Sequence, residues 1–176
     1  VMLGYWNNKK DTEEIIRDGW LYTGDIGKID PEDGYLKITD RKKDIIVSAG
    51  GDNISPSRIE EKLNIEPEIA QSMIYGDYKN YLVAIIVPDN DFSKQWAIEN
   101  NKKFSLIEIA KDEKFYNRIK ETIDQVNKRL SVIEKVRKFI IIDHEFTIEN
   151  EMMTPTLKVR RFVVKEKYGN ELENLY

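Results

Sequence analysis

The sequence predicts an α+β protein in which helices flank a small sheet of three strands, with a β-hairpin ahead of it. Two adjacent apolar runs at residues 69–75 and 81–87 resemble strands, and residues 113–130 carry a helical apolar stripe. The elements follow the order strand, helix, two strands, two helices, strand, helix. With 176 residues, the chain can form one good core, or one domain plus part of another.

The first twenty residues predict little regular structure. A short helical pattern begins at Thr12, with Glu13 and Glu14 suitably placed for a first turn. This segment cannot bury a core alone. The tryptophans of the chain are expected to have packing roles: Trp6, Trp20 and Trp96.

Residues 21–48 alternate strand-like segments with turns. The run 30–34 (DPEDG) is a strong turn signal, and residues 35–39 alternate as a half-buried strand does. We interpret residues 35–47 as the approach to, and the start of, a second hairpin.

Later elements are marked by caps and by apolar patterns. Ser55 followed by Pro56 predicts the N-cap and first position of a helix, which buries Ile59 and Leu63. The apolar run at 81–87 is nearly continuous, as expected of a strand covered on both faces. In order, we expect a helix at 57–64, strands at 69–75 and 81–87, helices at 92–101, 106–111 and 113–130, a strand at 139–142 and a helix at 162–175.

Composition and charge exclude several classes of function. No apolar run approaches the ~20 residues that span a bilayer and no leader opens the sequence, so we expect a cytoplasmic protein and leave peripheral membrane contact open. The chain has no cysteine, which excludes thiolate chemistry within it. Residues 1–40 carry nine acidic and five basic residues, which leaves twenty-three of each elsewhere. This balance argues against nucleic-acid binding.

Four short segments could carry chemistry, and each also has an ordinary structural explanation. Asp25 after a Tyr-Thr-Gly turn could accept from both hydroxyls of a ribose, but a turn aspartate would look the same. The segments 40–44 (DRKKD) and 48–53 (SAGGDN) could contact phosphate or line a ligand channel, or be a charged turn and a reversal of the chain. Lys158, in the proline-stiffened segment 154–161 (TPTLKVRR), is a mobile point charge or part of a basic surface loop.

Taken together and in this order, the segments resemble the adenylate-forming superfamily, which includes acyl-CoA synthetases, peptide-synthetase adenylation domains and firefly-type luciferases. Residues 19–25 (GWLYTGD) resemble its ribose-binding signature, 40–44 its hinge motif and 154–161 the loop of its catalytic lysine. Leu157, where most relatives have glycine, favours the long-chain fatty acyl-CoA synthetases. Asp40, residues 54–56 (ISP), residues 146–150 (FTIEN) and the closing Leu-Tyr favour them too. Val47 departs from the many relatives that have lysine there.

The resemblance implies a role for each matching residue. Lys158 would be catalytic, Asp25 and Arg41 would bind the ribose of ATP or AMP, and Asp40 would be the hinge. Lys43 would be associated with the nucleotide or the hinge. The candidates for the CoA channel are Gly50, Gly51 and Asn53.

The resemblance also implies that the chain is the C-terminal part of a larger ATP-dependent fatty acid–CoA ligase, inactive in isolation. Residues 1–40 would end the large N-terminal domain, and residues 41–176 would form the small mobile domain. The segments that hold the adenine, the phosphates and the fatty acid are missing, so its partner would be its own large domain and its ligands fatty acid, ATP and CoA. No metal ligand cluster is expected, and Mg²⁺ would be held mainly by phosphates and the missing domain.

Two alternatives remain at this stage. One is an adenylate-forming ligase with another acceptor, such as acyl carrier protein, or a luciferase-like oxygenase. The other is an α+β module that acts in isolation only through binding. His144, the sole histidine, is expected to be structural or exposed rather than a base.

Overall fold

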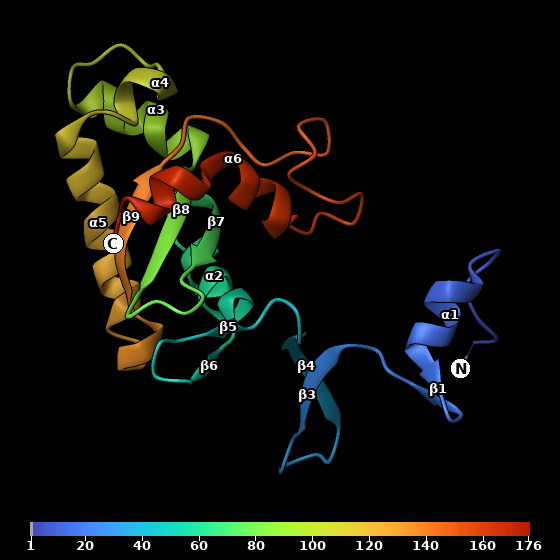
Figure 1. Cartoon of the computed structure of the whole chain (residues 1–176). Coiled ribbons are helices and arrows are strands. Elements are labelled where there is room, and N and C mark those ends of the chain that lie inside the picture. The colour runs from blue at the N-terminus through green and yellow to red at the C-terminus, as the bar shows by residue number, and fades with distance from the viewer. Residues whose placement is uncertain (1) are drawn as a thin grey trace. The chain divides into compact units, whose positions relative to one another are not determined.

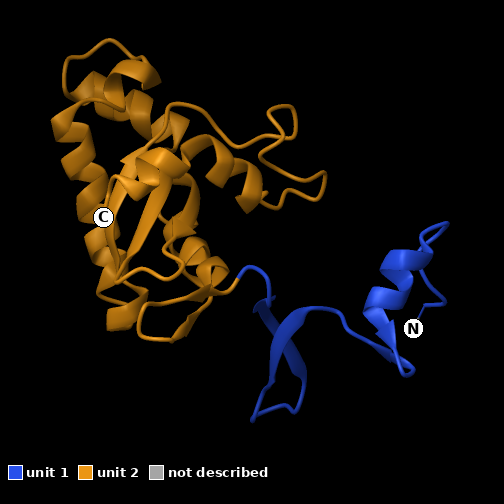
Figure 2. Cartoon of the chain, in the orientation of Figure 1, with its two compact units in different colours: residues 1–44 blue, residues 45–176 orange. Residues whose placement is uncertain are grey.

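The computed structural model describes residues 2–176, which divide into two compact units (Figure 2). Unit 1 ends at Asp44, and unit 2 comprises Ile45–Tyr176. A boundary between two packed units does not identify the residue about which they would rotate. The hinge at Asp40 and the boundary after residue 40 therefore stay predictions.

Unit 1 consists of one short helix and two hairpins. Helix α1 (Lys9–Ile15) is followed by β1 (Ile16–Arg17) paired with β2 (Trp20–Leu21), and then by β3 (Asp25–Ile29) paired with β4 (Leu36–Arg41). The predicted start of the helix at Thr12 is wrong. The Asn8 side chain accepts a hydrogen bond from the Asp11 backbone at 3.1 Å and caps the helix one turn earlier.

Unit 1 buries no apolar core of its own within the part of the chain that the structure describes: all of the buried apolar side chains belong to unit 2. Trp6 and Trp20 are 92% and 74% exposed, so the packing roles predicted for them are wrong within this chain. Trp96, at 7% exposure, is a core residue as predicted. A segment with so many exposed aromatic side chains and so few elements cannot cover them itself.

Unit 2 is built on a three-stranded sheet with the order β7-β8-β9 (Figure 1). Strand β7 (Ile69–Tyr75) pairs antiparallel with β8 (Leu82–Pro88), which pairs parallel with β9 (Val136–Ile141). Every residue of the central strand β8 is buried, as predicted for a strand covered on both faces. The short hairpin of β5 (Ile46–Val47) and β6 (Asn53–Ile54) precedes the sheet.

Helices cover both faces of this sheet and create two cores. Leu82, Ala84 and Ile86 of β8 pack in one cluster, whereas Val83 and Ile85 pack in the other. The helices are α2 (Pro56–Asn64), α3 (Asn90–Glu99), α4 (Leu106–Ile109), α5 (Glu113–Asn127), the 3-10 turn η1 (Val132–Glu134) and α6 (Arg161–Glu173). The first core contains side chains of α2, α3, α4 and α5, and the second contains those of α6. The predicted α+β class, with helices that flank a three-stranded sheet, is confirmed.

Caps explain where the main helices begin and end. Ser55 accepts from Arg58 and Pro56 is the first helical residue of α2, as predicted. Helix α5 ends at Asn127, three residues short of the predicted end, because the Asn127 side chain exchanges two hydrogen bonds with the backbone of Val136 (2.8 and 2.9 Å). The same pair fixes the start of β9, three residues before the predicted one. Within residues 2–176, no helix combines the length and apolarity needed to cross a membrane.

Glu134 should contribute stability that depends on pH. Its carboxylate accepts from the Ser131 backbone (3.1 Å) and hydroxyl (2.7 Å) and pairs with Arg58 at 3.4 Å. Burial opposes ionisation of Glu134, but the Ser131 hydrogen bonds and the Arg58 charge outweigh it and hold the pKa of Glu134 below its usual value. A lowered folded-state pKa stabilises the protein above the unfolded-state pKa of ~4.3, and this contribution is lost as pH falls through the folded-state pKa.

We therefore expect Glu134→Gln to lower the free energy of unfolding by about 1 kcal/mol at neutral pH. The difference from the parent chain should shrink as pH falls below ~4.3, where the parent carboxylate is increasingly protonated. Urea unfolding of both proteins at neutral pH and below pH ~4.3 measures this difference, with a change at the exposed Glu61, Glu61→Gln, as control. A difference that stays constant with pH would contradict the assignment.

Candidate functional site

The predicted ribose-binding pair lies together in unit 1. Asp25 is the first residue of β3 and Arg41 the last of β4, and the two are cross-strand partners in the register of this hairpin. Arg41 Nε lies 3.1 Å from Asp25 Oδ1. The pair is open to solvent, with 25% of the Asp25 side chain and 53% of the Arg41 side chain exposed, so both can face a ligand.

Gly24 shapes the approach to this pair. Its φ of +70° lies in the left-handed region, which a side chain would strain. The Gly24 carbonyl accepts from the Lys42 backbone at 2.8 Å, which closes the hairpin beyond Arg41. The Asp25 backbone donates to Thr23 Oγ1 at 3.1 Å. The predicted TGD turn is therefore an ordered start to β3 with a carboxylate at its end.

Asp40 and Lys43 also belong to unit 1. The Asp40 carboxylate accepts from the Arg41 backbone at 2.7 Å, and Asp40 pairs with Ile26 across the hairpin. Lys43 is exposed in the turn that follows β4, where the Asp44 backbone donates to the Arg41 carbonyl. Neither geometry by itself assigns a hinge or a nucleotide contact.

The candidate CoA-channel residues lie in the hairpin between β5 and β6 in unit 2. Gly51 has a φ of +87° and donates to the Ser48 carbonyl at 2.9 Å, so the turn needs a residue that tolerates left-handed backbone. Gly50 and Gly51 are exposed, and Asn53 pairs with Val47 across the hairpin. The glycine pair thus presents bare backbone at the surface.

A second loop braces this hairpin, and sequence reasoning missed it. The Asp77 carboxylate accepts from the Val47 backbone (3.1 Å), the Tyr78 backbone donates to the Val47 carbonyl (2.7 Å), and Ala49 donates to the Lys79 carbonyl (3.0 Å). Tyr78 has a φ of +57° and is 73% exposed. The hydrogen bonds that hold the glycine turn in one position keep the Tyr78 backbone in this strained conformation. Only a contact between positions thirty apart reveals this, so no local pattern could have predicted it.

Lys158 follows the tip of another small hairpin in unit 2. The Thr154 backbone donates to the Lys158 carbonyl at 2.8 Å, and Leu157 donates back to the Thr154 carbonyl at 2.9 Å. Pro155 and Thr156 form the turn, and Met153 and Val159 pair at the base. The Lys158 side chain is exposed, and its ammonium makes no hydrogen bond or ion pair with any described residue. The hairpin therefore holds the backbone while the charge stays available.

Leu157 adopts a backbone conformation that glycine tolerates best. Its φ is +58°, as in three-residue hairpin loops in which a turn is followed by one left-handed residue. The side chain is 70% exposed, so packing does not compensate for the strain. The loop conformation at Leu157 is therefore one that glycine would adopt without strain.

The two candidate regions of unit 2 project from different parts of it. In Figure 1, the β5–β6 hairpin and the orange loop before α6 leave the central sheet at separate places. A site that used both in turn would have to present each region separately.

Comparison with solved structures defines the class of protein. The adenylation domain of a carboxylate reductase from Mycobacterium chelonae superimposes with a TM-score of 0.82 at 27% identity, over 99% of this chain and 26% of that one. The corresponding domain of a carboxylic acid reductase from Segniliparus rugosus, in complex with AMP and a co-purified carboxylic acid, gives 0.81 at 26% identity, over 100% and 26%. The fold is that of the C-terminal region of adenylate-forming proteins.

The chain belongs to the family of AMP-binding enzyme C-terminal domains, whose model matches residues 43–176. A long-chain-fatty-acid–CoA ligase of Mycobacterium tuberculosis is 40% identical over 178 aligned residues, which cover all of this chain and 30% of that protein. Long-chain-fatty-acid–CoA ligase 5 of Mus musculus is 34% identical, over all of this chain and 26% of that protein. The chain thus spans less than a third of the length of these relatives.

Leu157→Gly should stabilise the Lys158 hairpin. Relief of the left-handed leucine is worth ~1–2 kcal/mol, and the greater freedom of glycine in the unfolded chain offsets about half of it. We expect a gain of a few tenths to about 1 kcal/mol in the free energy of opening, measured by hydrogen exchange of the Lys158 amide, which donates to Thr154 Oγ1.

Thr156→Gly is the control for a glycine in the same turn at a position without a positive φ; it also removes the 3.0 Å contact between the Thr156 and Thr154 hydroxyls. It should weaken the hairpin. Equal destabilisation by both changes would show that the backbone of Leu157 is not strained.

Proposed function

We propose that the chain is the C-terminal part of an ATP-dependent long-chain-fatty-acid–CoA ligase. The observation that carries the proposal is the exposed Lys158 on an ordered hairpin in a chain whose whole length aligns with such ligases. In the proposed reaction, a fatty acid carboxylate attacks the α-phosphate of ATP and pyrophosphate leaves. The sulfur of CoA then attacks the acyl carbon, and AMP leaves.

Lys158 would act in the first half-reaction. Its ammonium would stabilise the negative charge that develops on the oxygens of the α-phosphate and of the carboxylate. Asp25 would accept from the ribose hydroxyls, and Arg41 would donate to ribose oxygens through both half-reactions. The 3.1 Å contact between Asp25 and Arg41 supports this, because it pre-positions both side chains before the ligand arrives.

Before the second half-reaction, the small domain would turn a different surface toward the bound acyl-adenylate. Rotation about Asp40 would remove Lys158 and bring the turn with Gly50, Gly51 and Asn53 to the pantetheine path of CoA. A hinge needs only one or a few residues whose backbone dihedrals can change. The separate positions of the two regions in unit 2 support an alternation rather than joint use. Lys43, exposed beside the hinge, would contact nucleotide or hinge groups in one of the two states.

The exposed apolar surface of unit 1 supports a missing partner. Large apolar side chains of unit 1 are exposed, among them Leu3, Trp6, Trp20, Ile29 and Tyr35. A large N-terminal domain of the same protein, to which residues 1–40 would belong, would cover them. That domain would also bind the adenine and the fatty acid.

Mg²⁺ accompanies ATP in the proposed reaction. Within residues 2–176, no three His, Asp or Glu side chains gather as metal ligands would. We propose that this Mg²⁺ is held mainly by the phosphates and by the missing domain. We propose that the protein is cytoplasmic; peripheral contact with a membrane stays a prediction.

In the intact protein, Lys158→Ala should lower fatty-acid-dependent exchange of pyrophosphate into ATP by ~10²–10³-fold. Thioester formation from preformed acyl-adenylate and CoA should survive, because the lysine acts only on the first step. The exposed Lys120→Ala on α5 is the control for loss of a surface charge. Undiminished pyrophosphate exchange in Lys158→Ala would contradict the catalytic role of Lys158. Transfer of the acyl group to acyl carrier protein rather than to CoA would favour the alternative ligase with another acceptor.

The isolated chain should bind ATP, AMP and CoA weakly or not at all. It carries the ribose pair but none of the predicted adenine or phosphate pockets. Isothermal titration of residues 1–176 with each ligand measures this. Tight binding of ATP would contradict the proposed division of the site between this chain and a missing domain.

A further inference from the structure

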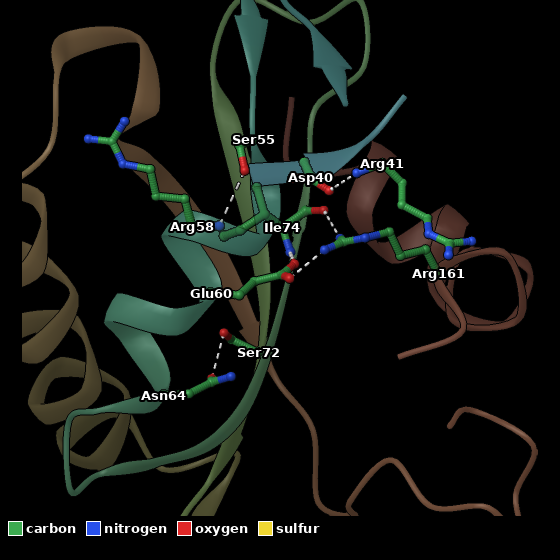
Figure 3. A network of polar contacts seen from close by, with 9 residues as sticks. All are labelled: Asp40, Arg41, Ser55, Arg58, Glu60, Asn64, Ser72, Ile74 and Arg161. Carbon is green, nitrogen blue, oxygen red and sulfur yellow. Dashed lines mark hydrogen bonds and ion pairs between the residues drawn. The ribbon is translucent and has the colours of Figure 1, made fainter. Parts of the chain in front are cut away.

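Two charged side chains occupy the open edge of the sheet in unit 2. The Ile74 backbone donates to Glu60 Oε1 at 2.6 Å, and its carbonyl accepts from Arg161 Nη1 at 3.3 Å. Arg161 Nη2 also pairs with Glu60 Oε2. Figure 3 shows the three residues joined in this way. Strand β7 is an edge strand, so Glu60 and Arg161 bind the two polar groups that a fourth strand would otherwise pair.

The pair is too buried to be a surface ion pair. Only 11% of the Glu60 side chain and 21% of the Arg161 side chain are exposed. Loss of one partner would leave a largely buried charge with less compensation. Arg161 is also the first residue of α6, where the helix dipole disfavours a cation. Glu60, rather than the helix, therefore accounts for the arginine at this position.

Arg161 lies at the base of the Lys158 hairpin. Only Val159 and Arg160 separate it from Lys158, and the Arg160 backbone donates to the Met152 carbonyl at 2.7 Å. Met152 is 2% exposed in the core that α6 forms. The hairpin is thus fixed on one side by Met152 in this core and on the other by Arg161 on the sheet edge.

We propose that Glu60 is a positioning residue for the first half-reaction: through Arg161 and Ile74 it fixes the base of the hairpin that presents Lys158. The inference rests on the proposed function. Glu60 lies on α2 and touches no reacting atom in this scheme. Its effect passes through the placement of Lys158, so adenylate formation depends on it and attack by CoA does not.

A merely structural ion pair would behave differently. Loss of such a pair would lower the stability of unit 2 and would affect both half-reactions alike. The Glu68–Arg118 pair is the matched control, because Glu68 is similarly buried, with 8% of its side chain exposed, and pairs with α5 away from the hairpin. Glu68→Gln should therefore change stability without separating the half-reactions.

The test uses the intact protein at a temperature where each variant is folded. Glu60→Gln should lower fatty-acid-dependent pyrophosphate exchange by ~10-fold or more, since displacement of a catalytic group by about 1 Å costs up to ~10²-fold. Thioester formation from preformed acyl-adenylate should stay within about twofold. Arg161→Lys, which keeps the charge but not the two-pronged geometry, gives a second variant with the same expected split.

A double-mutant cycle separates placement from other effects. In a Lys158→Ala background, Glu60→Gln should cause no further loss of exchange, because there is no ammonium left to position. An equal loss in both half-reactions, or a further ~10-fold loss in that background, would overturn the inference. An inactive parent protein would refute the proposed function itself. An active parent in which Lys158→Ala is without effect would overturn only the roles of Lys158 and Glu60.

Discussion

Burial of β8 on both faces is the constraint on which the rest of unit 2 depends. A three-stranded sheet cannot shield its central strand alone, so helices must cover each face. Alternate residues of β8 then enter separate cores, one lined by α2 to α5 and the other by α6. Because α6 is the only helix of the second core among residues 2–176, the segment between β9 and α6 leads to the face of the sheet opposite α5. Lys158 lies on that segment.

The edge of the sheet is where these two layers are joined by charge rather than by apolar packing. Glu60 comes from the α2 layer and Arg161 from the α6 layer, and both end on the backbone of Ile74. An apolar contact there would leave the Ile74 amide and carbonyl unpaired, at a cost of roughly 1–3 kcal/mol for each buried group. The ion pair satisfies both groups and sets a unique position for the start of α6. Specific placement, more than stability, is what such a buried pair can provide.

The sequence predicted the elements that depend on local patterns. Local sequence is enough to predict three features: the apolar run of β8, the apolar stripe of α5 and the Ser55–Pro56 cap. Contacts between positions far apart in the sequence could not be predicted from local patterns. Examples are Asn127 with Val136, Asp77 with Val47 and Glu60 with Arg161. In unit 1, Trp6 and Trp20 look like core residues by type, and only the structure shows that this chain has nothing to bury them. The order of the motifs indicated the family, whereas only the structure shows that the backbone of Leu157 is left-handed.

The exposure of Lys158 sets the limit on what this chain can do alone. An ammonium about 4 Å from a phosphate oxygen contributes about 1 kcal/mol in water, and about 4 kcal/mol where the effective dielectric constant is near 20. The first value corresponds to less than a tenfold change in rate and the second to nearly a thousandfold. The catalytic role proposed for Lys158 therefore requires that other protein exclude water around the tip of the hairpin. The ordered base of the hairpin lowers the cost of that event, because the backbone that carries Lys158 loses little further freedom when the site closes.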